Sequence, residues 1–273
     1  MGPKWALCYD CAQHAWRRNM PVEGFDLNGK KALVIGAGSA VGRAIALALK
    51  ETGAEVAVTS TRKDAADSDA AAETARLLGG AAARSIDATS ASQVNEAVDE
   101  AFQRMGRLDI LVNCPDLFLA KPTAETSDAE WDNVFAANLS SVFFACRAAG
   151  PRMAKQGNGR IINVASGLGE RGLPNCAAYC AVEGGVFNLT RALAQEWAAA
   201  GVTVNVIAHG WLEDTPGLGD PDPKTNRLLR YIPMRRAGRP DEVAPLAVYV
   251  ASDSAAYLTG RTLIVDGGLL AHL

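Results

Sequence analysis

Residues 31–50 read KALVIGAGSAVGRAIALALK, and this stretch decides the fold. A short apolar run leads into a glycine-rich turn, and the turn opens a segment in which apolar residues have helical spacing. Glycines at a strand-to-helix turn let the backbone approach a pyrophosphate, and the amides and positive dipole end of the helix attract the anion. The alternative is a tight turn that binds no ligand. The predicted phosphate-binding residues are Gly36, Gly38, Ser39 and Gly42.

Apolar runs and helical patterns continue to alternate after this turn, which is the order expected of βαβ units around a parallel sheet covered on both faces. Strands are predicted at residues 31–35, 55–60, 82–86, 109–113, 159–165, 202–207 and 262–265. Helices are predicted to begin near Ala40, Asp64, Ser90, Ser127, Ala177 and Asp241. The expected fold class is therefore α/β, a single doubly wound Rossmann domain with a seven-stranded parallel sheet and helices on both faces.

We expect this domain to span residues 25–273, preceded by an N-terminal extension over residues 1–24. The extension contains Cys8, Cys11 and His14. Two thiols and an imidazole at short spacing could bind zinc, but a closed tetrahedral site needs a fourth ligand that the sequence does not assign. We therefore predict no metal site, and an extension that is a packing arm or a flexible leader.

A second irregular segment runs from His209 to Pro240, after the sixth predicted strand. It contains five prolines and several glycines, and it has no long period. Long excursions at the carboxyl end of a strand commonly form lids or substrate loops. We expect residues 209–240 to shape the substrate site.

The composition excludes several classes of protein. The chain has 273 residues, of which 49% are hydrophobic and 21% charged, and its net charge is -3. It is too apolar for disorder and too balanced in charge for an electrostatic nucleic-acid binder. No uncharged apolar stretch reaches about 18 residues and the N-terminus lacks the order of a signal peptide, so we expect a soluble, cytoplasmic protein without a membrane segment. The scattered cysteines resemble reduced core thiols: Cys114, Cys146, Cys176 and Cys180.

The end of the second predicted strand bears on the choice of coenzyme. An acidic residue there binds the adenosine ribose hydroxyls of NAD, whereas a basic residue suits the extra phosphate of NADP. Residues 58–63 read VTSTRK, and none of them is acidic; the first acid after the strand is Asp64. Ser60 and Arg62 are therefore predicted to contact the coenzyme, and NADP is preferred. If Arg62 and Lys63 are only solvated charges that open a helix, NAD is the alternative.

These features, in this order, resemble the classical short-chain dehydrogenase/reductase family, and the likeness runs from about Phe25 to Gly268. Asp87 looks like the aspartate with which the family contacts adenine. Asn113, in the sequence NCPD, keeps the first residue of the family's NNAG motif. Thr215 lies where family members often hold the nicotinamide carboxamide. The resemblance implies that these residues bind NADP or NAD.

The resemblance also implies a set of catalytic residues. Tyr179 heads the family's YxxxK pattern, and it would donate or accept the proton of the carbonyl or alcohol. Ser166 matches the serine that steadies the substrate oxygen, and Asn138 matches the asparagine of the proton relay. The pattern is then broken, because Glu183 stands where the lysine is expected.

Glu183 changes the expected chemistry. Residues four apart on a helix share a face, so its carboxylate is expected where the family's ammonium would lie beside Tyr179. A like charge disfavours the phenolate, so alcohol oxidation is expected to suffer more than carbonyl reduction. The alternatives are an ordinary enzyme that has lost one lysine, a non-catalytic dinucleotide-binding protein, and a lyase or hydratase in which Glu183 is the acid/base.

The sequence thus predicts an NAD(P)(H)-dependent oxidoreductase of a small or medium-sized carbonyl/alcohol pair, with activity reduced by Glu183. Its expected partners are this small-molecule substrate and further copies of the chain. The resemblance implies a homotetramer or homodimer formed through the helices that bear Asn138 and Tyr179. No nucleic acid and no membrane is expected as a partner.

Overall fold

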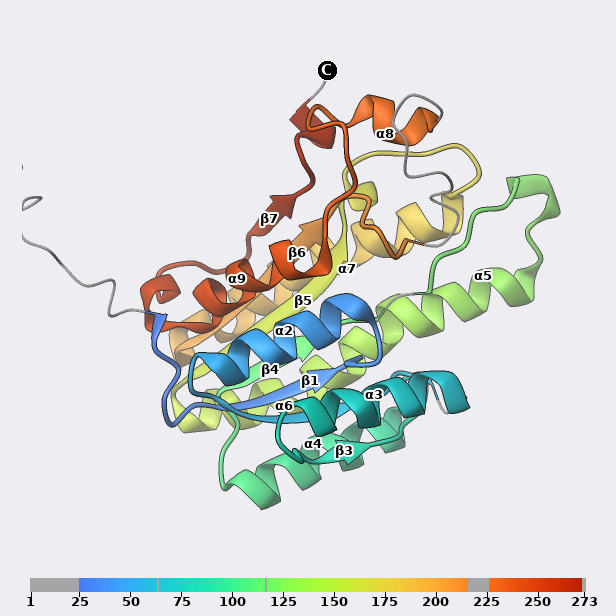
Figure 1. Cartoon of the computed structure of the whole chain (residues 1–273). Helices are drawn as coiled ribbons and strands as arrows, with labels where there is room; N and C mark the ends of the chain where they lie inside the picture. The colour runs from blue at the N-terminus through green and yellow to red at the C-terminus, as the bar shows by residue number, and fades with distance from the viewer. Residues whose placement is uncertain (1–24, 63, 116, 216–225, 272–273) are drawn as a thin grey trace, which may run out of the picture.

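The computed structural model describes residues 25–62, 64–115, 117–215 and 226–271 (Figure 1). The predictions for the N-terminal extension, including those for Cys8, Cys11 and His14, lie outside the described residues. The same holds for the middle of the predicted substrate loop, residues 216–225.

The structure is built on one seven-stranded sheet, and its neighbouring strands are all parallel, as predicted. The strand order is β3-β2-β1-β4-β5-β6-β7, so the sheet grows in opposite directions from β1 and from β4. In such a sheet the crevice outside the carboxyl ends of these two strands is the usual ligand site. The strands are β1 (Lys31–Ile35), β2 (Glu55–Thr59), β3 (Ala83–Arg84), β4 (Ile110–Asn113), β5 (Gly159–Ser166), β6 (Val202–His209) and β7 (Thr262–Val265).

Five strands differ in length from the prediction, and two of them, β3 and β6, differ by more than one residue. β3 is only two residues long, because after Arg84 the hydroxyl of Ser60 takes over the pairing with the Ile86 backbone at this edge of the sheet. β6 runs on to His209, which pairs in register with Ser166 of β5. The longer β6 brings His209 to the same edge of the sheet as the predicted catalytic serine.

The six predicted helices begin within one residue of the expected positions, and Ser39, Asp64 and Ser127 cap three of them through their side chains. The short helix α8 was not predicted, because it lies in the segment expected to be irregular. The helix predicted from Ser127 is longer than one regular segment, because a π-helical turn, Ala136–Ser140, joins two α-helices. Within the described ranges, none of the helices combines the length and apolar character that a membrane crossing requires. The α-helices are α2 (Ala40–Glu51), α3 (Ala65–Leu77), α4 (Ala91–Met105), α5 (Asp128–Phe135), α6 (Ser141–Gln156), α7 (Ala177–Trp197), α8 (Arg227–Tyr231) and α9 (Pro240–Ala251).

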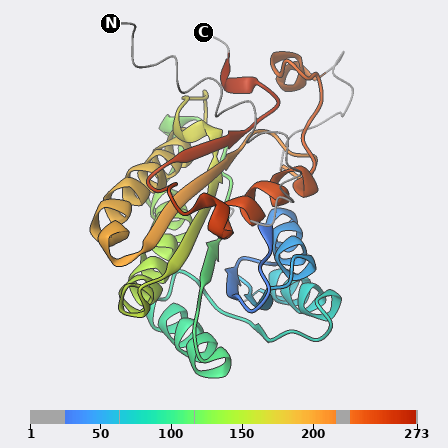
Figure 2. The same cartoon turned by 90° about the vertical axis from the view of Figure 1, so that its left-hand side faces the viewer.

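Helices cover the sheet on both faces, with α2, α3 and α9 on one side and α4, α6 and α7 on the other (Figure 2). This arrangement explains the continuous apolar run of β1. Ala32 and Val34 pack into the first layer, while Leu33 and Ile35 pack into the second. A strand buried on both faces has no polar side, so it reads as an unbroken apolar run.

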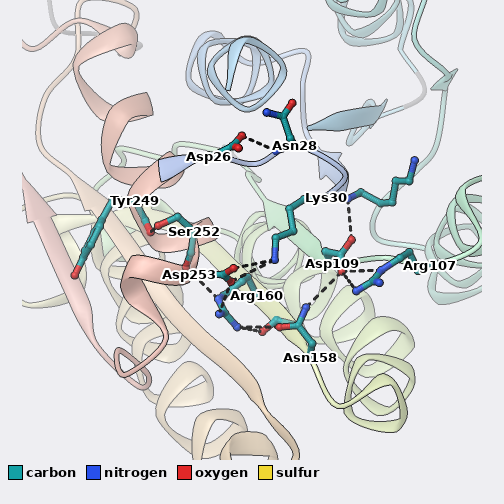
Figure 3. Close-up of polar contacts among 12 residues, drawn as sticks. Asp26, Asn28, Lys30, Arg107, Asp109, Asn158, Arg160, Tyr249, Ser252 and Asp253 are labelled. Atoms are coloured by element: carbon teal, nitrogen blue, oxygen red, sulfur yellow. Dashed lines mark hydrogen bonds and ion pairs between the residues drawn. The ribbon is translucent and has the colours of Figure 1, made fainter. Parts of the chain in front are cut away.

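A polar network closes the amino ends of the strands, at the opposite end of the sheet from the glycine turn (Figure 3). Asp109, just before β4, is 1% exposed. Its Oδ2 accepts the Lys31 amide at 2.9 Å, and its Oδ1 accepts Nε of Arg107 at 2.9 Å. Arg160 of β5 lies beside it and pairs with Asp253 at 3.4 Å. The network therefore ties the start of β4 to the start of β1.

Replacing Asp109 with alanine is expected to lower the free energy of unfolding by about 1.5 kcal/mol, because the Lys31 amide loses a buried acceptor. Urea denaturation followed by circular dichroism measures this change. The matched control is Asp99→Ala, which removes an exposed ion pair with Arg152 and is expected to cost less than about 0.5 kcal/mol. Equal losses in the two variants would contradict this account.

Candidate active site

The glycine turn between β1 and α2 is compact because its three glycines, Gly36, Gly38 and Gly42, have no room for a side chain. Gly36 has a φ of 98°, and a β-carbon there would collide with the Cys114 carbonyl of the neighbouring β4 chain. A β-carbon at Gly42 would collide with the Gly36 carbonyl. Ser39 caps α2, since its Oγ accepts the Gly42 amide at 3.0 Å. The amide end of α2 therefore opens at the carboxyl ends of β1 and β4, an arrangement that fits a pyrophosphate.

Ser60 is held in the interior at the end of β2. It is 0% exposed, and its hydroxyl donates to the Ile86 carbonyl at 3.1 Å and accepts the Ile86 amide at 3.0 Å. The hydroxyl of this predicted cofactor residue is therefore used in hydrogen bonds at the edge of the sheet. Arg62 is exposed, and its Nε pairs with Asp64 at 2.8 Å.

Asp67, in the first turn of α3, reaches back to the chain that leaves β2. Its Oδ2 accepts the amides of Thr61 and Arg62, each at 2.7 Å, and the side chain is largely buried. A β-carbon at Gly38 would collide with Oδ1 of Asp67, so the carboxylate packs directly against the glycine turn. Asp67 is not among the site residues predicted from the sequence.

Next to the glycine turn lies a pocket of about 230 Å³. It brings together Arg62 and Asp87, two of the predicted cofactor residues. Asp87 is oriented by Thr89, whose amide and hydroxyl both donate to Oδ1, at 2.9 and 2.6 Å. The lining residues are Thr61, Arg62, Asp87, Thr89, Pro115, Leu117, Asn133 and Ala137.

Asn113 does not direct its side chain into this pocket. The residue is 1% exposed, and its Nδ2 donates to Oδ1 of Asn163 at 2.9 Å. Asn163 in turn donates to the Thr190 hydroxyl at 2.8 Å, which links β4, β5 and α7. Cys146 lies in the same network, and burial raises the pKa of its thiol to about 12. A contact between Asn113 and a coenzyme would therefore have to use its backbone.

A second pocket lies at the carboxyl ends of β5 and β6, and it collects Ser166, Tyr179 and Thr215 from separate segments. Ser166 ends β5, Tyr179 lies in the first turn of α7, and Thr215 follows β6. The Ser166 hydroxyl accepts the Leu168 amide at 3.2 Å. The lining residues are Val41, Phe118, Ser166, Tyr179, His209, Gly210, Trp211, Leu212, Asp214 and Thr215.

Aromatic rings surround the phenol in this pocket. The Phe118 ring meets the Tyr179 ring edge to face with centroids 5.0 Å apart, and it meets Trp211 in the same way at 6.1 Å. Phe118 was not predicted to lie here, because it belongs to the irregular segment between β4 and α5. Both rings line the same pocket as Ser166 and Tyr179.

Asn138 lies in the π-helical turn and is 1% exposed. Its Oδ1 accepts the Leu117 amide and its Nδ2 donates to the Leu117 carbonyl, both at 3.0 Å. The side chain thus fixes the segment that lines both pockets, and a proton relay would have to use the backbone of this residue.

Glu183 lies one helical turn beyond Tyr179 on α7, and both residues are buried, at 4% and 5% exposed. Its Oε2 accepts the Ser166 amide at 2.6 Å. The helix therefore places the two side chains on one face, as expected. The carboxylate, however, bonds to the end of β5 that carries the predicted catalytic serine.

Neither a metal cluster nor a disulfide is found in the part of the chain that the structure describes. The thiols are buried or half-buried, in agreement with their prediction as core residues: Cys114, Cys146, Cys176 and Cys180.

A further pocket of about 280 Å³ lies between β2, the chain around β3, and α4. Its lining contains none of the predicted site residues, so pocket size alone does not identify the site.

The chain is similar in sequence to several oxidoreductases. A family model described as "Enoyl-(Acyl carrier protein) reductase" matches residues 36–270. A D-threitol dehydrogenase from Mycolicibacterium smegmatis is 38% identical over 245 residues, which cover 89% of this chain and 94% of that protein. An acetoacetyl-CoA reductase from Allochromatium vinosum is 37% identical over 243 residues, 88% of this chain and 98% of that protein.

The fold is also found in solved structures. The crystal structure of a candidate short-chain alcohol dehydrogenase from Sinorhizobium meliloti matches with a TM-score of 0.84 at 37% sequence identity. The match covers 91% of this chain and 99% of that chain. At this identity the likeness extends beyond the arrangement of the strands to the sequence itself.

Proposed function

The chain belongs to the short-chain dehydrogenase/reductase family, and on that premise we propose that it is an NAD(P)(H)-dependent oxidoreductase that interconverts a carbonyl and an alcohol. The observation that carries the proposal is that Ser166 and Tyr179 line one pocket, together with the aromatic rings of Phe118 and Trp211. This pocket and the pocket of Asp87 lie at the same edge of the sheet as the glycine turn. A hydroxyl pair beside a dinucleotide site is what proton and hydride transfer to one carbonyl requires.

The residues present fit a dinucleotide coenzyme. The pyrophosphate would bind at the glycine turn and the amide end of α2, and the adenosine end would bind in the pocket of Asp87. Thr215 would hold the nicotinamide end beside Ser166. When bound, the nicotinamide supplies or accepts the hydride.

The chain's own hydroxyl groups would handle the substrate oxygen. In reduction, Tyr179 donates a proton to the developing alkoxide, and in oxidation its phenolate accepts that proton. Ser166 donates a hydrogen bond to the same oxygen. We further propose that residues 209–240 form the wall of the site that faces the substrate. This role is supported by the residues between His209 and Thr215 that line the pocket. The substrate would be a small or medium-sized carbonyl or alcohol.

Glu183 is proposed to lower the activity of this site, because it stands where the family pattern has a lysine. Its Oε2 accepts the Ser166 amide, and α7 holds the carboxyl group one turn from Tyr179. The negative charge would then oppose formation of the phenolate. The same bond gives Glu183 a second role, since it positions the strand end that carries Ser166.

The coenzyme choice depends on the turn after β2. The position of Arg62 in the pocket of Asp87 supports the NADP preference that the sequence indicates. Asp67 of α3, whose carboxylate accepts the Thr61 and Arg62 amides of this turn, opposes that preference. We also propose a homo-oligomer, which is supported by the exposed aromatic side chains of Trp131 and Phe143 on α5 and α6.

The test of the proposed function is oxidation of NADH and of NADPH by the full chain with a panel of small aldehydes and ketones. We expect net coenzyme oxidation with at least one carbonyl, and formation of the corresponding alcohol. Tight coenzyme binding without turnover across the panel would favour the non-catalytic dinucleotide-binding protein. Product formation without coenzyme oxidation would favour a lyase or hydratase.

A further inference from the structure

A buried carboxylate fills the turn that follows β2. Oδ2 of Asp67 accepts the amides of Thr61 and Arg62 at 2.7 Å each, and the Thr61 hydroxyl lies 3.2 Å from the same oxygen. Asp67 is 8% exposed, so this arrangement is built into the interior of the turn. Successive backbone amides with a nearby hydroxyl form a concave anion-binding site. The protein therefore supplies its own anion to this site.

The second oxygen of the same carboxylate faces the glycine turn. A β-carbon at Gly38 would collide with Oδ1 of Asp67, so no side chain could separate the two segments. Gly38 belongs to the predicted pyrophosphate cradle, and Thr61 and Arg62 line the adjacent pocket. Asp67 thus lies between the two parts of the site that the adenosine half of a dinucleotide would span.

This position distinguishes the two coenzymes chemically. The unphosphorylated ribose of NAD carries hydroxyls, which donate hydrogen bonds to a carboxylate. The phosphorylated ribose of NADP carries a dianionic group, which a carboxylate repels and which would compete for the same amides. Arg62 offers limited compensation, because its guanidinium pairs with Asp64 and its side chain is 53% exposed.

We propose that Asp67 is a specificity-determining residue that disfavours the phosphorylated ribose, so that the chain binds NAD more readily than its Arg62 alone predicts. The inference rests on the proposed function, because it requires a dinucleotide at the glycine turn. A residue of α3 would then have the selective role that an acidic residue at the end of β2 usually has, and the preference for NADP would be weaker.

Equilibrium binding of NAD⁺ and NADP⁺, measured by isothermal titration calorimetry, tests the proposal without any turnover. The wild-type chain is expected to bind NAD⁺ at least as tightly as NADP⁺. In Asp67→Asn the amide oxygen still accepts the two backbone amides, while the charge is lost. We expect this variant to shift the ratio of the two dissociation constants about fivefold towards NADP⁺.

The matched control is Asp69→Asn, which removes the same charge from an exposed position two residues further along α3. Its ratio is expected to stay within about twofold of wild type. A wild-type preference for NADP⁺, or an unchanged ratio in Asp67→Asn, would overturn the role of Asp67. Binding of neither nucleotide would reject the proposed function and this inference with it. If Asp67→Asn does not fold, the wild-type ratio still decides the question.

Discussion

Replacing Tyr179 with phenylalanine is expected to lower kcat for carbonyl reduction about a thousandfold, which is within the range that a positioned general acid contributes. The substitution removes only the phenolic oxygen. The ring stays against Phe118, so the aromatic cover of the pocket is kept. Steady-state rates with saturating coenzyme and carbonyl measure the loss. The dissociation constant of the coenzyme is expected to change by less than about threefold, since the glycine turn is untouched.

A second tyrosine supplies the control for this experiment. Tyr249 lies on α9 and packs against Phe25, with ring centroids 5.8 Å apart and outside the pocket of Ser166. Tyr249→Phe is expected to keep kcat within about twofold of wild type. If Tyr179→Phe keeps more than about a tenth of the wild-type rate, Tyr179 is not the general acid and the proposed mechanism fails.

The fold follows from local patterns in the sequence because each pattern has a direct structural cause. The unbroken apolar run of β1 arises from burial on both faces, and the caps Ser39 and Ser127 mark helices where they begin. The glycine turn was predictable for the same reason, since a β-carbon at Gly36 or Gly42 would meet a backbone carbonyl. In these places the local sequence and the tertiary structure require the same conformation.

The orientation of polar side chains was less predictable, because it depends on contacts far apart in the chain. Ser60 and Asn113 are at the expected strand ends, yet their side chains bond to Ile86 and Asn163 inside the protein. Asp67 shows the reverse case, a residue that was not predicted at the site and lies beside it in the structure. Its sequence position is that of an ordinary acidic residue in a first helical turn, and only the three-dimensional path of the chain brings it to the glycine turn.

Replacing Glu183 with glutamine is expected to raise kcat for alcohol oxidation at neutral pH about thirtyfold, the equivalent of roughly 2 kcal/mol. Residues four apart on a helix have β-carbons about 6 Å apart. If the two charged groups are about 6 Å apart as well, they repel each other by roughly 2.8 kcal/mol at an effective dielectric constant of about 20. Loss of the negative charge therefore favours the phenolate of Tyr179. Glutamine keeps an oxygen that can accept the Ser166 amide, so the strand end stays in place.

The pH profile separates this electrostatic effect from a structural one. Oxidation requires the phenolate, so its rate rises with pH, and we expect the midpoint of that rise to move to lower pH in Glu183→Gln. Glu196→Gln, at an exposed position on the same helix, is the control and is expected to leave the midpoint unchanged.

Lysine at position 183 completes the test, because it reverses the charge instead of removing it. Electrostatics alone predicts that Glu183→Lys moves the midpoint further down than glutamine does. Lysine cannot accept the Ser166 amide, so a structural role predicts that it lowers kcat at every pH, while glutamine leaves the profile unchanged. A glutamine variant with the wild-type midpoint would therefore refute the electrostatic role of Glu183 and leave it as a positioning residue for Ser166.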